Sequence, residues 1–205
     1  MLGQTQYPRT PLDHYPTQPP PTQALMGVPQ IAERIERAVV WETCCGDGAI
    51  CKEIAPYVGD VLATDIAAYP GFDPDALVDL LSLNRLGDLN DHGITRVPNG
   101  IITNPPYGKE AQPIIEKSLE LMREVDGFVV MLLRHEWDCA DSRTPLFAHH
   151  PAFAAKITLT FRPHWVKPAE GEKAGSPRFS YAWFFWDWAK DPAAPALQLY
   201  ARKPK

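Results

Sequence analysis

The most specific chemical pattern in this sequence is the tetrapeptide Asn-Pro-Pro-Tyr, which directly follows an apolar run that ends at Thr103. Prolines cannot extend a strand because they lack a backbone N–H, so we expect a strand to end here in a stiff turn. The side-chain oxygen of Asn104 and the carbonyl of Pro105, held rigid by Pro106, are two hydrogen-bond acceptors. Together they can bind both hydrogens of a planar –NH2 and make its nitrogen nucleophilic, while Tyr107 offers a face on which a base can stack. The alternative is a rigid turn without chemistry.

A second pattern, the loop Thr-Cys-Cys-Gly-Asp-Gly-Ala, lies between a strand-like run and a helix-like segment. Gly46 and Gly48 let the backbone turn tightly and approach a ligand closely, although a plain connection between strand and helix could also use them. The third glycine of the dinucleotide-binding fingerprint is missing, and Glu42 at the end of the strand would repel a pyrophosphate. The loop therefore suits a ligand with a cationic amine or hydroxyl groups.

Two further acids end the next two predicted strands. Asp65 ends the strand that follows the glycine loop in the sequence. A carboxylate at that place can accept two hydrogen bonds from a ribose diol, and Asp79 could accept one from the amine of an adenine. A strand-end cap and a solvated turn residue are the simpler interpretations. Together with Glu42, these acids predict a cleft for a nucleoside without phosphates, such as S-adenosylmethionine. The departing sulfonium of that molecule would drive methyl transfer without a strong base.

The apolar pattern also predicts the scaffold that positions these residues. Strand-like runs that are continuously apolar alternate with helix-like segments as far as Arg134. This alternation is typical of a doubly wound α/β fold with a mostly parallel sheet covered on both faces. Two later runs, 154–161 and 179–188, are joined without a helix, so we expect an antiparallel pair at the sheet edge. The prediction is a seven-stranded sheet with an antiparallel C-terminal strand pair.

The segments around the sheet differ in character. Residues 1–22 are rich in proline and are predicted to form an extended N-terminal arm, followed by a helical region at 23–37. We expect residues 23–205 to form one domain without a separate target-recognition domain. The loop 162–178 is polar, positively charged and rich in glycine and proline, so it is the best candidate for a mobile functional loop.

Composition limits the class of protein. The chain has 205 residues, of which 45% are hydrophobic, as in ordinary globular domains. It has no apolar run long enough for a membrane helix and no signal-peptide pattern. The four cysteines fit neither a disulfide pattern nor a common zinc pattern, so we expect reduced thiols, no metal and a cytoplasmic location.

Charge is unevenly distributed along the chain. The formal net charge of −5 argues against a dedicated nucleic-acid binder, because such binders neutralise phosphates. However, residues 1–133 carry 9 Lys and Arg against 18 Asp and Glu, whereas residues 134–205 carry 11 against 7. The positive charge is therefore concentrated in the last third of the sequence.

The Asn-Pro-Pro-Tyr turn and the earlier glycine loop resemble those of class I S-adenosylmethionine-dependent amino-methyltransferases. Within this class the sequence looks most like the adenine-N6 DNA methyltransferases of small phage or prophage type. Three more segments of this sequence resemble those methyltransferases: Asp-His-Tyr-Pro-Thr-Gln-Pro near the start, Met-Leu-Leu-Arg after the tetrapeptide and Tyr-Ala-Trp-Phe-Phe-Trp-Asp near the end. The resemblance extends from Asp13 to Asp187 and implies a Rossmann-like methyltransferase fold.

The resemblance also implies roles for individual residues. The segment from Tyr15 to Thr17 would cover the methionine group of the cofactor, Asp65 would hold the ribose, and Asp79 would hold the adenine amine. The implied cofactor-binding residues are Tyr15, Thr17, Glu42, Cys44, Gly46, Gly48, Asp65 and Asp79, and the implied catalytic residues are Asn104, Pro105, Pro106 and Tyr107.

The sequence departs from the family at three positions and in one domain. Thr43 and Cys44 stand where the family usually has a proline and a small residue, and Gln18 replaces a usual proline. Because a target-recognition domain is absent, only the short basic segment 138–178 remains to contact a substrate. An aromatic residue among cations suits base stacking and phosphate contact, and the predicted substrate-binding residues are Arg162, Trp165, Lys167 and Arg178.

The sequence therefore predicts a methyltransferase that acts on adenine N6 in DNA, with the base flipped out of any duplex. Two alternatives stay open. The same turn could hold an RNA base or a glutamine side-chain amide of a protein. The chain could also be a non-catalytic module that binds S-adenosylmethionine. The intact turn argues against that module, whereas the acidic charge and the missing recognition domain favour it.

Overall fold

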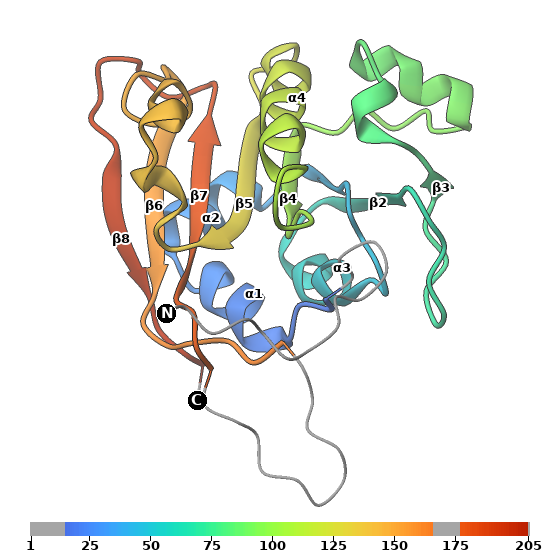
Figure 1. Cartoon of the computed structure of the whole chain (residues 1–205). Helices are drawn as coiled ribbons and strands as arrows, with labels where there is room; N and C mark the ends of the chain where they lie inside the picture. Colours follow the sequence, from blue (N-terminus) through green and yellow to red (C-terminus); the bar gives the residue numbers. More distant parts are fainter. Residues whose placement is uncertain (1–14, 166–176, 205) are drawn as a thin grey trace, which may run out of the picture.

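The computed structural model describes residues 15–165 and 177–204, and its centre is an eight-stranded sheet (Figure 1). The strand order is β3-β2-β1-β4-β5-β7-β6-β8, and the strands alternate with helices along the first two thirds of the chain. The predicted doubly wound, mostly parallel α/β fold is therefore confirmed. The strands are β1 (Val39–Glu42), β2 (Asp60–Asp65), β3 (Ala76–Leu77), β4 (Gly100–Thr103), β5 (Phe128–Arg134), β6 (Phe153–Leu159), β7 (Tyr181–Asp187) and β8 (Leu197–Ala201).

The C-terminal part of the sheet differs from the prediction in one respect. The expected antiparallel pair is present, because β7 runs antiparallel to both β5 and β6. It does not form the sheet edge, however, since β8 adds an eighth strand parallel to β6. Most β8 side chains are exposed, including Leu197 and Tyr200. An exposed edge strand lacks the continuous apolar pattern that identifies buried strands, so sequence reasoning missed it.

Helices cover the sheet on both faces, and alternate residues of each strand point to opposite faces. In β5, Val129 and Met131 pack in the core under α4 (Ala111–Arg123), while Val130 and Leu132 pack in the core under the other three helices. The helix α4 buries Ile115, Leu119 and Met122, which recur at helical spacing on one face. The remaining α-helices are α1 (Pro19–Met26), α2 (Pro29–Ile35) and α3 (Ala49–Ile54).

The start of α1 corrects the predicted extent of the N-terminal arm. We expected residues up to 22 to be extended, but α1 begins at Pro19. Proline is tolerated in the first turn of a helix because the N–H groups there have no intrahelical acceptor. The expected break in the helical region is present at Gly27 and Val28, between α1 and α2. Residues 1–14 lie outside the described ranges.

Short 3-10 helices complete the connections, and one of them, η3, borders the site described below. None of the helices within the described ranges is long and apolar enough to cross a membrane. The 3-10 helices are η2 (Ala55–Tyr57), η3 (Leu80–Ser82), η4 (Leu86–His92), η5 (Trp137–Cys139) and η6 (Asp141–Leu146).

Candidate active site

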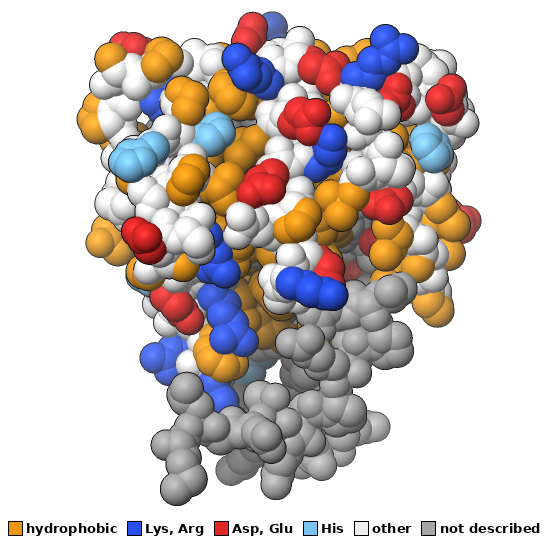
Figure 2. Space-filling model, turned by 45° about the horizontal axis from the view of Figure 1, so that its top comes forward, with side chains coloured by type: hydrophobic (Ala, Val, Ile, Leu, Met, Phe, Trp, Pro, Cys, Tyr) orange, Lys and Arg blue, Asp and Glu red, His pale blue; other side chains and the backbone are white. Residues whose placement is uncertain are grey.

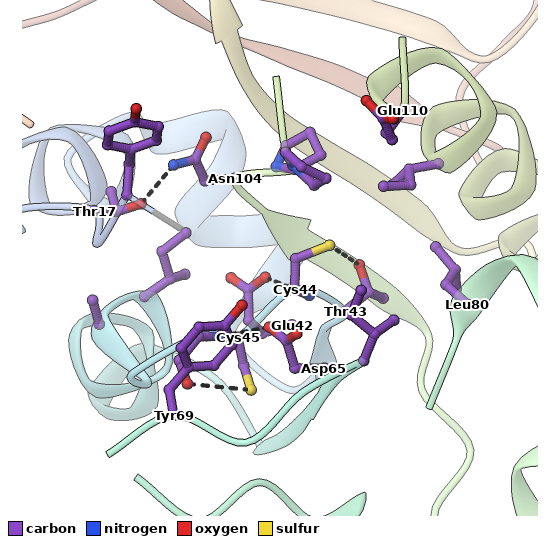
Figure 3. A pocket seen from close by; sticks show the side chains of 18 of the residues that line it. Thr17, Glu42, Thr43, Cys44, Cys45, Asp65, Tyr69, Leu80, Asn104 and Glu110 are labelled. Carbon is purple, nitrogen blue, oxygen red and sulfur yellow. Dashed lines mark hydrogen bonds between the residues drawn. The ribbon is translucent and has the colours of Figure 1, made fainter. Parts of the chain in front are cut away.

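The carboxyl ends of β1, β2 and β4 open into a cavity of about 270 Å³. Because these strands are parallel and adjacent, the residues that follow them meet at one edge of the sheet. The cavity is lined by the segment before α1, the glycine loop, residues after β2 and β3, and the Asn-Pro-Pro-Tyr turn after β4 (Figure 3). The structure therefore brings together the two motifs that the sequence places far apart.

The charge of the cavity lining is strongly one-sided. Five carboxylates line it, whereas no Lys, Arg or His of the described residues does. Such a lining opposes a ligand that carries phosphates and favours one that carries positive charge. The five acidic residues are Glu42, Asp47, Asp65, Asp79 and Glu110.

Glu42 is the most deeply buried of these acids, at 1% exposure. Its Oε1 accepts a hydrogen bond from the hydroxyl of Thr103 and a second from the N–H of Cys44, at 3.2 Å. Its Oε2 is buried and has no hydrogen-bond partner among the described residues. Burial raises the pKa of Glu42 to about 8, because the charged form loses its hydration. The carboxyl group is thus poised to ionise when a cation approaches its free oxygen.

Asp65 fixes the conformation of the glycine loop. Its carboxylate accepts hydrogen bonds from the N–H of Gly46, at 2.8 Å, and of Ala67, at 3.3 Å. A carboxylate has about four acceptor sites, so both oxygens can still accept from a bound diol. Asp79, an exposed residue, borders the cavity and caps η3 by accepting from the N–H of Leu81 at 3.0 Å. The positions of Asp65 and Asp79 are therefore compatible with a ligand-binding role and also with a purely structural one.

Gly46 and Gly48 differ in their relation to the cavity. Gly46 lines it, as predicted, with φ of +52°. Gly48 is not among the lining residues, and its predicted role in cofactor binding stays a prediction. Its φ is +74°, and a Cβ atom there would lie 2.3 Å from the ring of Phe72. Gly48 is needed because its backbone is left-handed and an aromatic ring packs against it.

Tyr15, Thr17 and Cys44, three of the predicted cofactor-binding residues, line the cavity. Thr17 lies two residues before α1 and is 95% buried, with 5% of its surface exposed. Burial raises the pKa of the Cys44 thiol to about 12, so the thiol stays protonated at neutral pH. Burial also raises the pKa of the neighbouring Cys45 thiol. Both cysteines are therefore packing groups rather than nucleophiles.

The Asn-Pro-Pro-Tyr turn begins directly after Thr103, the last residue of β4. The side-chain Nδ2 of Asn104 donates to the hydroxyl of Thr17 at 3.0 Å, and the hydroxyl of Tyr107 donates to Asn104 Oδ1 at 2.8 Å. Burial holds the pKa of Tyr107 well above its usual range, so this hydroxyl keeps its proton. The carboxamide of Asn104 is thus held at both ends.

An aromatic cluster lies beside this turn. The ring of Tyr107 is 6.1 Å from that of Trp165 and 6.0 Å from that of Tyr181, and the last two rings are 4.9 Å apart. Trp165 was predicted from the sequence, but Tyr181 was missed. The register of β5 and β7 places Tyr181, the first residue of β7, opposite Arg134, the last residue of β5. That shared position was the signal that could have found them.

Three arginines lie close in sequence or in register to the aromatic cluster: Arg134 is opposite Tyr181, Arg162 lies three residues before Trp165, and Arg178 lies three residues before Tyr181. Arg134, Arg162 and Arg178 are exposed, and none of them pairs with a carboxylate among the described residues. The Arg134 guanidinium lies over the ring of Phe179 at 3.8 Å. In Figure 2 several Lys and Arg side chains lie together at the lower left, on the side of β6 and β7. The predicted residue Lys167 lies outside the described ranges.

Comparisons with known proteins identify the fold. No protein-family model matches the sequence, and no curated protein matches it significantly. Among solved structures, a protein of Pyrococcus horikoshii described provisionally as an RNA methyltransferase matches with a TM-score of 0.62 and 15% identity, over 91% of this chain and 93% of that one. A dimethyladenosine transferase from Plasmodium falciparum matches with a TM-score of 0.52 and 15% identity, over 85% of this chain and 62% of that one.

The fold is that of the Rossmann-like methyltransferases. A Lactococcus lactis protein described provisionally as a hemolysin also matches, with a TM-score of 0.56 and 9% identity, over 88% of this chain and 89% of that one. At such identities the likeness extends to the fold, and the methyltransferase fold supports more than one described activity. The chemistry of this chain must therefore be argued from its own cavity.

Proposed function

We propose that this protein is an S-adenosylmethionine-dependent methyltransferase that acts on an exocyclic amine, with adenine N6 in DNA as its preferred target. The observation that carries the proposal is the cavity itself. It is lined by five carboxylates and no described basic residue, and it opens onto the Asn-Pro-Pro-Tyr turn. S-adenosylmethionine has a positive sulfonium, a positive ammonium group and no phosphate, so its charge is complementary to this lining.

The free oxygen of Glu42 supports the choice of cofactor. A buried carboxylate oxygen without a partner is costly unless a ligand supplies a donor. The ammonium group of S-adenosylmethionine would supply one, and Asp65 would accept from the ribose hydroxyls. Asp79 would accept from the adenine amine, and Tyr15 and Thr17 would border the methionine end. When bound, the cofactor supplies a methyl group activated by its sulfonium.

The residues of the turn would bind the target amine. Asn104 Oδ1 and the carbonyl of Pro105 accept its two hydrogens, and Pro106 keeps that carbonyl in place. No donor among the described residues occupies the Pro105 carbonyl. The aromatic ring of Tyr107 stacks on the base, beside Trp165. In a duplex the base must be flipped to reach this position.

The second candidate substrate is an RNA base. Arg134, Arg162 and Arg178, which are exposed and make no ion pair within the described part of the chain, can neutralise phosphates of either nucleic acid. Of the solved structures with this fold, one is described provisionally as an RNA methyltransferase and another as a dimethyladenosine transferase. A protein glutamine amide would not need this unpaired positive charge. The unpaired positive charge therefore favours a nucleic acid over a protein, and the resemblance of the sequence to adenine-N6 DNA methyltransferases places DNA ahead of RNA.

The proposed function is tested by methyl transfer from labelled cofactor to DNA, RNA and protein in parallel. DNA from cells that express the protein should contain N6-methyladenine, and DNA from cells that express Asn104→Ala should not. Label in RNA alone would move the target to RNA. Cofactor binding without transfer to any of the three substrates would favour the non-catalytic module.

Asp65→Ala is expected to weaken S-adenosylmethionine binding roughly 10- to 150-fold, as for the loss of a hydrogen bond to a charged group. Calorimetry measures this effect. Because Asp65 also holds the glycine loop, a matched control is needed. Asp75 accepts from the N–H of Ala63 at 2.9 Å and does not line the cavity. Asp75→Ala should lower the melting temperature and leave cofactor affinity within about twofold. Equal affinity in wild type and Asp65→Ala would contradict the assignment.

Neutralising Arg162 or Arg178 is expected to weaken DNA binding equally for all sequences. Each change should make the slope of log affinity against log salt concentration shallower by about 0.9, since one phosphate contact is lost. Titrations at several salt concentrations measure the slope. Arg37 is exposed two residues before β1, at the opposite end of the sheet, so Arg37→Ala should not alter it. Affinity that is indifferent to salt and to both changes would favour the protein substrate.

A further inference from the structure

Thr17 makes a contact that the sequence did not predict. Its hydroxyl accepts a hydrogen bond from Asn104 Nδ2 at 3.0 Å, across 87 positions of the sequence. Figure 3 shows this bond at one side of the cavity, with Glu42 and Asp65 below it. The hydroxyl is buried with its residue, so water does not compete strongly for the bond.

The other end of the Asn104 carboxamide determines its orientation. The structure places Oδ1 of the amide next to the Tyr107 hydroxyl, which keeps its proton and donates to that oxygen at 2.8 Å. Nδ2 then faces Thr17. An amide oxygen has two acceptor sites, so Oδ1 can accept from a target amine while it still accepts from Tyr107.

Thr17 is held in place by the docking of α1 on the sheet rather than by a loose loop. The indole N–H of Trp183, in the middle of β7, donates to the carbonyl of Pro21 at 3.0 Å. Leu25 of the same helix is fully buried. Since Thr17 lies two residues before α1, its hydroxyl has a defined position relative to the turn after β4.

We propose that Thr17 is a positioning residue for Asn104: its hydroxyl holds the carboxamide with the acceptor oxygen directed toward the target amine. This inference rests on the proposed function, in which Asn104 accepts from that amine. It adds a coupling between two parts of the site, because Thr17 also lines the cavity. The segment that borders the cofactor then sets the orientation of the group that binds the substrate.

The test replaces the hydroxyl without changing the shape of the side chain. Thr17→Val should lower the single-turnover rate of methyl transfer about 10-fold, because the carboxamide can now rotate. The dissociation constant for S-adenosylmethionine and the KM for the nucleic acid should stay within about twofold. Thr17→Ser, which keeps the acceptor, should retain the rate within about threefold. No loss of rate in Thr17→Val would overturn the proposal.

Thr22→Val is the matched control. Thr22 is also a fully buried threonine next to the same segment, but its hydroxyl has no hydrogen-bond partner among the described residues. The same chemical change there should preserve the rate and should not lower the melting temperature, because no hydrogen bond is lost. In an Asn104→Ala background, Thr17→Val should have no further effect on the rate. A full additional 10-fold loss would show that Thr17 acts through another group and would overturn the proposal.

A readout without activity separates this inference from the proposed function. The side-chain amide protons of Asn104 can be identified in NMR spectra by their absence in Asn104→Asp. They should exchange with solvent more slowly in the wild type than in Thr17→Val, and Thr22→Val should not change them. Equal exchange rates would overturn the inference whether or not the protein transfers methyl groups. If the Asn104 amide protons exchange more slowly in the wild type than in Thr17→Val but the protein methylates no substrate, the proposed function is refuted. The inferred contact between Thr17 and Asn104 would still stand.

Discussion

Asn104→Ala is expected to lower the single-turnover rate of methyl transfer at least about 100-fold, or about 2.7 kcal/mol, as for the removal of one preorganised polar group from an active site. The amine becomes a better donor as its nitrogen turns pyramidal, so the bond to Asn104 Oδ1 is strongest in the transition state. An interaction realised only there lowers kcat and leaves KM nearly unchanged. Rapid-quench kinetics with saturating cofactor measures the rate.

The structure refines what other changes at this position should do. Asn104→Asp should be milder, because the hydroxyls of Thr17 and Tyr107 can both donate to a carboxylate in the same position. Cofactor affinity should be nearly unchanged in both variants. Full activity in Asn104→Ala would mean that the tetrapeptide is only a rigid turn.

Changes at Tyr107 separate the ring from the hydroxyl. The ring packs beside Trp165 and Tyr181, and the hydroxyl occupies one acceptor site of Asn104. Tyr107→Phe keeps the ring but removes the donor to Asn104 Oδ1, so its rate should fall about 10-fold, as in Thr17→Val. Tyr107→Ala removes the stacking surface, which contributes roughly 1–3 kcal/mol per base, and should lose most activity. Equal rates in these two variants would exclude a stacking role for the ring.

The sequence predicted the residues that end strands better than those that approach from elsewhere. Glu42, Asp65 and the Asn-Pro-Pro-Tyr turn follow apolar runs, and parallel strands bring their carboxyl ends together. The sequence pattern was therefore enough to predict their common cavity. Gly48 shows the limit of such reasoning, because a glycine required by Phe72 has the same sequence signal as one required by a ligand.

Tertiary packing decides the features that the sequence did not predict. The bond between Thr17 and Asn104 depends on where α1 docks, which no local pattern encodes. The pairing of Arg134 with Tyr181 depends on the register between β5 and β7. The edge strand β8 is mostly exposed and pairs with β6, a neighbour distant in sequence. In each case a long-range contact selects the structure, and local propensity does not.

Glu42→Gln is expected to stabilise the ligand-free protein at pH 8 by the order of 3 kcal/mol. Burial raises the pKa of Glu42 from its ordinary value of 4.5 to about 8, so the folded chain keeps a proton that the unfolded chain has released. Between these two values stability falls as pH rises, because unfolding releases that proton. The gain from Glu42→Gln should therefore be small near pH 5 and large at pH 8.

Urea denaturation at both pH values measures this gain. Glutamine can still accept from the Thr103 hydroxyl and the Cys44 N–H, so the packing is kept. Glu36 is exposed and makes no hydrogen bond or ion pair within the described part of the chain, so Glu36→Gln is the control and should show no such pH dependence. A stability gain in Glu42→Gln that is equal at pH 5 and pH 8 would contradict the buried, protonated carboxyl group.

The same substitution should weaken S-adenosylmethionine binding at least about 10-fold, since the cationic ammonium loses a charged acceptor. At pH 6.5 the ammonium is protonated, and the Glu42 carboxyl of the free protein, with a pKa of about 8, is protonated too. Binding must then ionise Glu42, so the wild type should release close to one proton per cofactor, and Glu42→Gln should release none. Calorimetry in two buffers of different ionisation enthalpy counts these protons. Equal proton release in the two proteins would show that the free oxygen of Glu42 does not bind the cation, and the charge argument for the cofactor would then rest on the other four acidic residues of the lining.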